Sequence, residues 1–202
     1  MAKQKLDLYK LHADEYITPK TPELVKTKPG KYLSVQGKGA PGGEEFTKQV
    51  GALYGVAFTV KFALKGSGED YAVSKLEGLW WGTKSEGNFA LEPPEQWNWK
   101  LIIRTPDFVT KRQLNDAIAT LKKKGKGPEV GKVKLETIDE GLCVQMLHVG
   151  PYAEEGKTVR IMEEFVKEKD LKFHGLHHEI YLSDPRRVPA QRLKTILRMP
   201  VR

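Results

Sequence analysis

The 202-residue sequence predicts an α+β fold in which one strand-helix-strand-strand unit occurs twice in tandem. The expected elements follow the same order in both halves. The segment KLIIRTP at residues 100–106 aligns without gaps with KTILRMP at residues 194–200. A Val-Gln pair followed by a Pro and a Glu-Glu pair occurs at residues 35–45 and again, with one gap, at residues 144–155. Such a repeat usually relates two halves by a pseudo-twofold axis, and ligand clefts form readily where the halves meet.

The first unit is expected at residues 31–108. Its opening strand is KYLSVQGKG, residues 31–39. From residue 44 to about 65, Phe46, Val50, Leu53 and Ala57 recur at three- and four-residue intervals, which predicts a helix. Residues 71–83 and 97–106 are rich in aromatic and branched side chains, and they predict two further strands.

A connecting helix and loop are expected at residues 109–131. Thr110 is a suitable N-cap for the helix, and Leu114, Ile118 and Leu121 form one apolar stripe along it.

The second unit is expected at residues 132–202. Residues 130–150 predict a hairpin that turns at Asp139-Glu140-Gly141. Val159, Met162 and Phe165 then mark a helix that ends near residue 169, and residues 174–185 and 193–202 predict the last two strands. Residues 1–30 form an N-terminal extension in this division.

Composition and charge exclude several classes of protein. The single cysteine, Cys143, cannot form an intramolecular disulfide, which favours the reducing cytoplasm. No signal-peptide pattern and no run of eighteen apolar residues occurs, so neither secretion nor membrane contact is expected. The formal net charge is +8, but the lysines are scattered, and the densest run, at residues 122–126, closes a helix. We therefore expect no direct nucleic-acid partner.

Four tryptophans lie within two expected strands, between residues 80 and 99. Strand alternation puts Trp97 and Trp99 on the apolar face of their strand. A packed sheet core is the alternative explanation, and it holds for most tryptophans. Together with Trp80 and the nearby carboxylate of Glu77, however, these rings suit a flat or cationic organic ligand, which needs stacking area and a charge partner.

Glu179 is the sharpest single candidate for a site residue. Alternation puts it on one strand face with His177 and Tyr181. A carboxylate inside an apolar strand is seldom buried unless it is paired or functional. The alternative is an exposed acid or a salt bridge to the arginines at residues 186–187. If the halves align in register, Glu77 matches Glu179, and two carboxylates face one cleft.

The segment HVGPY at residues 148–152 lies between an expected strand and a helix. We expect Tyr152 to direct its hydroxyl into the cleft mouth and His148 to contact the ligand. The alternative is a Gly-Pro turn with a tyrosine packed over it. His177 and His178 are neighbours in a strand and face opposite sides, so we expect no metal site. Without a phosphate-binding glycine pattern, we expect no cofactor.

Four segments together resemble the GyrI-like small-molecule-binding family: HVGPY, HHEIYLSDP, LEGLWW and WNWKLIIRTPDFVT. The likeness covers nearly all of residues 32–201, and it is strongest to stand-alone members that begin with LDLYKL. The resemblance implies an antiparallel sheet with helices packed on one side and a ligand groove between the two units. It also implies bulky aromatic, often cationic ligands, with the glutamate that matches Glu179 in the pocket.

Some stand-alone relatives are cyclopropanoid hydrolases, which open the cyclopropane of DNA-alkylating natural products, and the resemblance implies this detoxifying activity here. Ring opening restores an aromatic phenol, so the enzyme need only position water and stabilise a developing phenolate. We expect Glu179 to act as general base, with Tyr152 or Tyr181 orienting the water. Trp81 and Trp99 would sandwich the planar compound.

Two other functions stay open on the sequence. A non-catalytic multidrug-binding or sequestering protein would use the same pocket, with the glutamate as counter-ion. A modulator of a DNA topoisomerase would act through protein contact, but this reading rests on the family's name more than on residues.

Overall fold

One eight-stranded sheet, with every neighbouring pair of strands antiparallel, organises the computed structural model over the residues that it describes, 5–83 and 91–202. The strands are β1 (Glu23–Lys26), β2 (Gly30–Lys38), β3 (Glu77–Trp81), β4 (Asn98–Arg104), β5 (Lys134–Ile138), β6 (Leu142–Val149), β7 (His177–Tyr181) and β8 (Lys194–Pro200). The α+β class predicted from the sequence is confirmed.

Four α-helices accompany the sheet in the described part of the chain: α1 (Leu8–Leu11), α2 (Glu44–Gly66), α3 (Lys111–Lys123) and α4 (Glu155–Glu168). The predicted cap of α3 is present. Thr110 Oγ1 accepts from the backbone N–H of Gln113, and Gln113 Oε1 accepts from the backbone N–H of Thr110. Short 3₁₀ turns are η2 (Pro94–Gln96), η3 (Pro128–Lys132), η4 (Tyr152–Glu154) and η5 (Ala190–Arg192). None of the described helices is both long and apolar enough to span a bilayer.

The strand order is β1-β6-β8-β7-β3-β4-β2-β5. Outward from the central β7–β3 pair, β8 and β6 follow on one side, and β4 and β2 follow on the other. Two strand-helix-strand-strand units related by a twofold axis would give this order. That the halves are a repeat, with the boundaries predicted above, stays a prediction.

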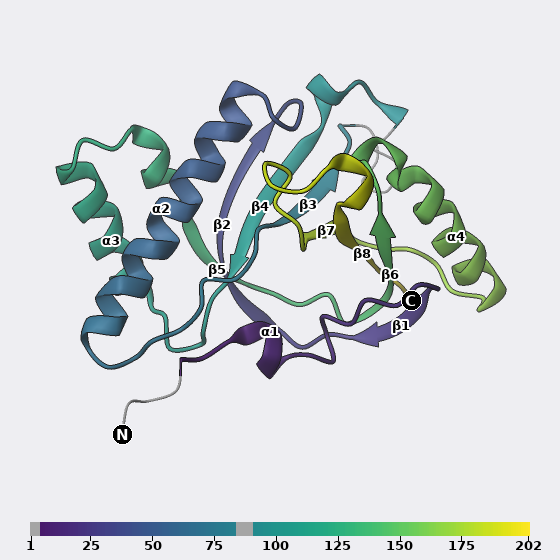
Figure 1. Ribbon diagram of the computed structural model, residues 1–202, viewed down its shortest axis with the longest axis horizontal. Coiled ribbons are helices and arrows are strands. Elements are labelled where there is room, and N and C mark those ends of the chain that lie inside the picture. The colour runs from purple at the N-terminus through teal and green to yellow at the C-terminus, as the bar shows by residue number, and fades with distance from the viewer. Residues whose placement is uncertain (1–4, 84–90) are drawn as a thin grey trace.

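Helices α2, α3 and α4 all pack on one face of the sheet, called the helix face below (Figure 1). The larger core lies under α2 and α3 and includes Leu53, Val60, Trp99 and Leu101, all fully buried or nearly so. A second core lies under α4 around Met162. The core is therefore divided between the two ends of the sheet, with β3 and β7 between them.

The opposite face, called the far face, is covered by the N-terminal segment. Tyr16 packs against Ile180 and Ile196 there, and β1 adds an edge strand beside β6. Figure 1 shows this purple segment running along the sheet on the side away from the helices. Side chains from this segment therefore pack on the far face, and its strand β1 belongs to the sheet.

Six charged side chains form a buried network on the far face: Glu15, Glu77, Glu140, Arg104, His178 and Arg198. This far-face ion network is held by short contacts. Arg104 Nη1 lies 2.7 Å from Glu15 Oε2, and His178 lies 3.0 Å from carboxylate oxygens of both Glu77 and Glu140. Arg198 Nη1 lies 3.2 Å from Glu140 Oε2.

Contacts between opposite charges offset the cost of burying these ionised side chains. Burial acts to lower the pKa of His178, but Glu140 and Glu77 raise it to about 9. Burial likewise acts to raise the pKa of Glu140, but His178 and Arg198 lower it to about 2. His178 and Glu140 are therefore both charged at neutral pH, within a network of three basic and three acidic side chains.

The predicted hairpin at residues 130–150 is wrong. Strand β5 pairs with β2, whereas β6 pairs with β1 and β8 near the other end of the sheet. The predicted turn itself is present, since Gly141 has a positive φ of 65° and its N–H donates to Asp139 Oδ1. However, Leu135 packs against the core under α2, so the chain crosses the sheet after the turn instead of folding back.

Candidate functional site

Strand β7 carries the central residues of the candidate site. Because side chains alternate along a strand, His177, Glu179 and Tyr181 point to the helix face, and His178 points to the far face. Glu179 is only 8% exposed and His177 only 7% exposed. The predicted sharing of one face by these three residues is confirmed.

Two aromatic residues hold the Glu179 carboxylate in place. The Tyr181 hydroxyl donates to Glu179 Oε2 at 2.7 Å, and the indole N–H of Trp80 donates to the Tyr181 oxygen at 3.1 Å. The other carboxylate oxygen, Oε1, lies 3.4 Å from His177 Nε2. Glu179 is thus oriented by a chain of hydrogen bonds that starts in the neighbouring strand β3.

Gly78 leaves room for the rings of this hydrogen-bond chain. Replacing Gly78 with Ala is expected to destabilise the protein by about 1–3 kcal/mol. A Cβ atom there would lie 2.9 Å from the Tyr181 hydroxyl and 2.8 Å from the Trp80 indole nitrogen, so both rings would have to move. Urea denaturation measures the change. Gly51→Ala is the matched control, because a Cβ in this exposed position of α2 meets nothing within 4 Å. The Gly51→Ala variant should be more stable than the wild type by about 0.5–1 kcal/mol. A Gly78→Ala variant as stable as the wild type would contradict the packing argument.

The first residue of α4, Glu155, joins the site and was not predicted from the sequence. Its side chain is 7% exposed, and its Oε1 atom is buried without a hydrogen-bond partner. The sequence marks it only as one of two acids at a helix start, and such acids are usually solvated, as Glu44 and Glu45 of α2 are. Its burial depends on how α4 sits over β7, which no local pattern reveals.

Glu155 and Glu179 influence one another strongly. Burial, followed by the charge and hydrogen bonding of Glu179, raises the pKa of Glu155 well above its ordinary value. Burial and the same Glu179 charge also raise the pKa of the Tyr181 hydroxyl. Two buried carboxyl groups in contact cannot both carry a negative charge cheaply, so the raised pKa of Glu155 favours its protonated form beside the Glu179 carboxylate.

Glu155, His177 and Glu179, called the site triad below, offer three candidate metal-ligand atoms within 4.8 Å of one another. Carboxylate and imidazole groups are ligands that divalent transition metals accept. The triad therefore provides both the proton-transfer groups of a hydrolytic site and the donor set of a cation site.

Tyr152 and His148 lie beside the triad with different roles. The Tyr152 ring is 38% exposed and packs edge-to-face on Tyr181, with 5.8 Å between the ring centroids. The imidazole of His148 is occupied by protein partners: Nε2 donates to the Pro151 carbonyl at 3.1 Å, and Nδ1 accepts from Thr158 Oγ1 at 2.9 Å. His148 thus fixes the turn that carries Tyr152, and its predicted ligand contact stays a prediction.

The expected sandwich of Trp81 and Trp99 is wrong. Trp80 pairs with Trp99 on the helix face, so Trp81 points to the far face. Trp99 is fully buried in the core and packs over Gly37, where a Cβ would lie 2.2 Å from the ring. Trp80, through its bond to Tyr181, is the tryptophan that reaches the site.

The expectation that Glu77 and Glu179 face one cleft is also wrong. Gly78, not Glu77, lies opposite Glu179, so Glu77 belongs to the far face. There its carboxylate contacts His178 at 3.0 Å and accepts from the Tyr16 hydroxyl at 3.1 Å. The second carboxylate at the site is supplied by Glu155 instead.

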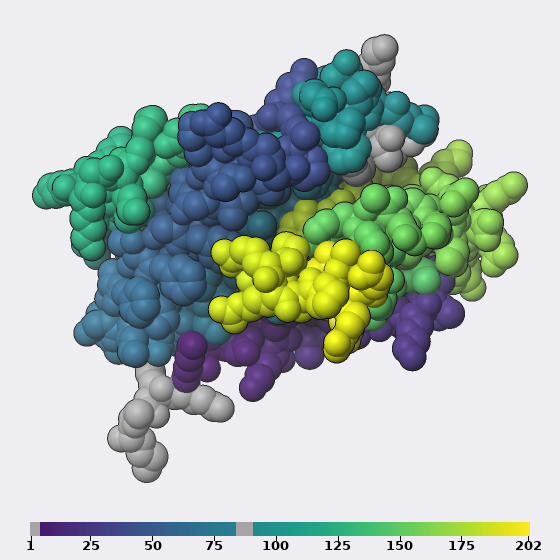
Figure 2. Space-filling model, turned by 45° about the horizontal axis from the view of Figure 1, so that its top comes forward, coloured from purple at the N-terminus to yellow at the C-terminus, as the bar shows by residue number. Residues whose placement is uncertain are grey.

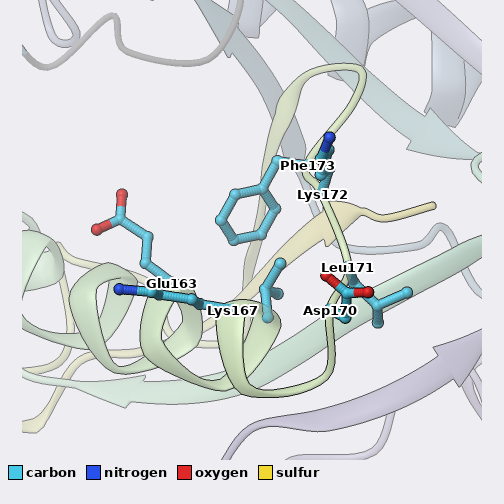
Figure 3. Close-up of a pocket in the computed structure, with 7 residues that line it drawn as sticks. Glu163, Lys167, Asp170, Leu171, Lys172 and Phe173 are labelled. Carbon is cyan, nitrogen blue, oxygen red and sulfur yellow. The ribbon is translucent and has the colours of Figure 1, made fainter.

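Two hollows in the described structure lie away from the triad. One is an open depression of about 430 Å³ at the end of α4, where Figure 3 shows Phe173 among Glu163, Lys167, Asp170 and Lys172. Its charges are mixed, and it presents no convergent polar set for a ligand. The other, of about 210 Å³, lies between α1 and the end of β4 and includes His12 and Arg104.

Comparison with known proteins identifies close relatives. The profile of the GyrI-like small molecule binding domain matches residues 101–202. A crystal structure of an uncharacterized conserved protein from Listeria innocua is 40% identical with a TM-score of 0.91, and one of a hydrolase from the same organism is 38% identical with a TM-score of 0.87. Each alignment covers 98% of this chain and 100% of the other.

More distant structures share the fold alone. The C-terminal domain of EcmrR is 12% identical, with a TM-score of 0.58 over 90% of this chain and 97% of that one. No curated protein matches the chain. The identity and full coverage of the Listeria structures, together with the profile match over half of the residues, show that this chain belongs to the GyrI-like small-molecule-binding family.

Proposed function

We propose that this protein hydrolyses cyclopropane-bearing aromatic alkylating compounds at the site triad, with Glu179 as the general base. The observation that carries the proposal is the buried Glu179 carboxylate, oriented by Tyr181 and placed beside the second carboxyl group of Glu155. Two full-length relatives at 38% and 39% identity are described as hydrolases, which supports a hydrolytic reaction. The cyclopropane substrate follows from the resemblance of the motifs.

The reaction needs one activated water. Glu179 Oε1 takes a proton from the water as the water oxygen bonds to the cyclopropane methylene carbon. The carbon–carbon bond of the ring breaks, and its electron pair passes into the conjugated dienone, which becomes a phenolate. The phenolate gains a proton from solvent, and Glu179 returns its proton to solvent, so the net change is the addition of one water.

Tyr181 and Glu155 prepare Glu179 for this role. Tyr181 occupies Oε2 and leaves Oε1 as the oxygen that can accept the proton. The protonated Glu155 carboxyl adds a hydrogen-bond donor beside the ionised Glu179. A site with one net negative charge also attracts aromatic cations, which fits the class of ligand that the family binds.

Aromatic rings surround the base on the helix face. Trp80 stacks on Phe46 of α2, with 6.0 Å between the ring centroids, and Tyr152 closes the other side through Tyr181. We place the ligand groove here, between α2 and α4. The segment between β7 and β8, with its short turn η5, lies between these helices in Figures 1 and 2, so a large ligand enters by displacing it.

Incubation with a cyclopropane-bearing duocarmycin-type compound, followed by mass analysis of the products, tests the function. We expect a product heavier by one water that forms in proportion to protein. Unchanged compound together with quenched tryptophan fluorescence would replace the hydrolase by a drug-sequestering protein. Unchanged compound without quenching would reject this ligand class.

A further inference from the structure

The contact between Glu155 and Glu179 needs a positive partner. Both groups accept hydrogen bonds when ionised, both are more than nine-tenths buried, and Glu155 Oε1 has no hydrogen-bond partner. A proton shared by the two carboxyl groups gives one oxygen of each a hydrogen-bond partner. A metal cation satisfies the same oxygens and also neutralises both charges, so the pair alone is compatible with either occupant.

His177 distinguishes a metal site from a simple pair of acids. Its Nε2 atom lies 3.4 Å from Glu179 Oε1. Ligands about 2.1 Å from a tetrahedral zinc ion are separated from one another by roughly 3.4 Å, which is the spacing of these two atoms. Because all three candidate ligand atoms lie within 4.8 Å, a small inward movement of Glu155 completes three-coordinate binding.

The surroundings of Glu179 resemble those of metal-bound carboxylates. Tyr181 holds the outer oxygen, Oε2, and is itself held by Trp80, so Oε1 is directed toward His177. Hydrogen bonds of this kind orient metal ligands and increase affinity. Three ligands from two elements would leave one position of a tetrahedral ion for a further ligand.

We propose that Glu155, His177 and Glu179 bind one divalent transition-metal ion of the zinc class. The site goes beyond the proposed hydrolysis and does not depend on it, because binding is measured without substrate. Occupancy would take the oxygen that the metal-free protein uses as base.

Isothermal titration with Zn²⁺ after chelator treatment, and the visible absorption of the Co²⁺-loaded protein, test the proposal. We expect one ion per chain and a Co²⁺ spectrum typical of low coordination. His177→Gln and Glu155→Gln should each weaken binding at least tenfold, and Tyr181→Phe should weaken it about tenfold or more. Glu154→Gln and His174→Ala, at exposed positions one and three residues from a ligand in the sequence, are the matched controls and should leave the affinity unchanged.

The outcomes separate clearly. No saturable binding, or binding that the folded His177 and Glu155 variants retain at full affinity, overturns the site. Loss of binding in the control variants would place the ion elsewhere and overturns it as well. Circular dichroism establishes that each variant is folded, and the two Gln substitutions nearly preserve side-chain volume. Because no turnover is measured, failure of the hydrolase proposal leaves these results unaffected.

Discussion

Glu179→Gln is expected to lower turnover of a cyclopropane substrate by about 10²- to 10⁴-fold while ligand binding is retained. The amide keeps the shape of the side chain and still accepts the hydrogen bond from Tyr181. It cannot take a proton from water, so only the chemical step is lost. Single-turnover kinetics measures the step, and tryptophan quenching measures binding.

Glu155→Gln is the matched control for this prediction. An amide resembles the protonated carboxyl that we assign to Glu155, so this variant should keep turnover within about a factor of ten of the wild type. Assays contain a chelator so that both variants are compared without metal. Equal losses in the two variants would show that the carboxyls do not have the separate roles proposed here, and unchanged turnover in Glu179→Gln would reject Glu179 as the base.

Arg198→Met is expected to destabilise the fold by about 3–5 kcal/mol. The guanidinium is 1% exposed, donates to Gln145 Oε1 at 2.7 Å and contacts Glu140 Oε2 at 3.2 Å. Methionine fills similar volume but leaves Glu140 buried with only His178 as its charged partner in the far-face ion network. Urea denaturation at neutral pH measures the loss.

Lys194→Met is the control, since this exposed residue begins the same strand. Its effect should stay within about 0.5 kcal/mol. A loss below 1 kcal/mol for Arg198→Met would mean that the buried charges are dispensable to stability and that apolar packing carries the far face.

Local patterns in the sequence predicted most elements of the fold. The helix at residues 44 to about 65 is α2 (Glu44–Gly66), because its apolar spacing and its packing against the sheet agree. Glu179 was found for a similar reason, since a carboxylate interrupts an otherwise apolar strand. Signals of this kind depend on neighbours in the chain, which the sequence displays directly.

The prediction for Glu77 was wrong because it depended on the register between distant strands. The gapless match of residues 100–106 with 194–200 aligns Ile102 with Ile196, and their strand partners are Glu77 and Ile180. The counterpart of Glu77 is therefore Ile180, one residue past Glu179. A shift of one position moves a strand side chain to the other face, which is why Glu77 was assigned to the wrong side. Glu155 was missed because its burial comes from helix placement.

The N-terminal segment makes contacts that can form only late in the synthesis of the chain. Glu15 contacts Arg198, which lies 183 positions later in the sequence, and β1 pairs with β6. At typical translation rates of about 5–20 residues per second, roughly 10–40 s separate the synthesis of these two residues. During that interval Tyr16 and the first strand have no β6 or β8 to cover. Residues 15–26 are thus among the first made, yet their contacts with β6 and β8 are among the last that can form.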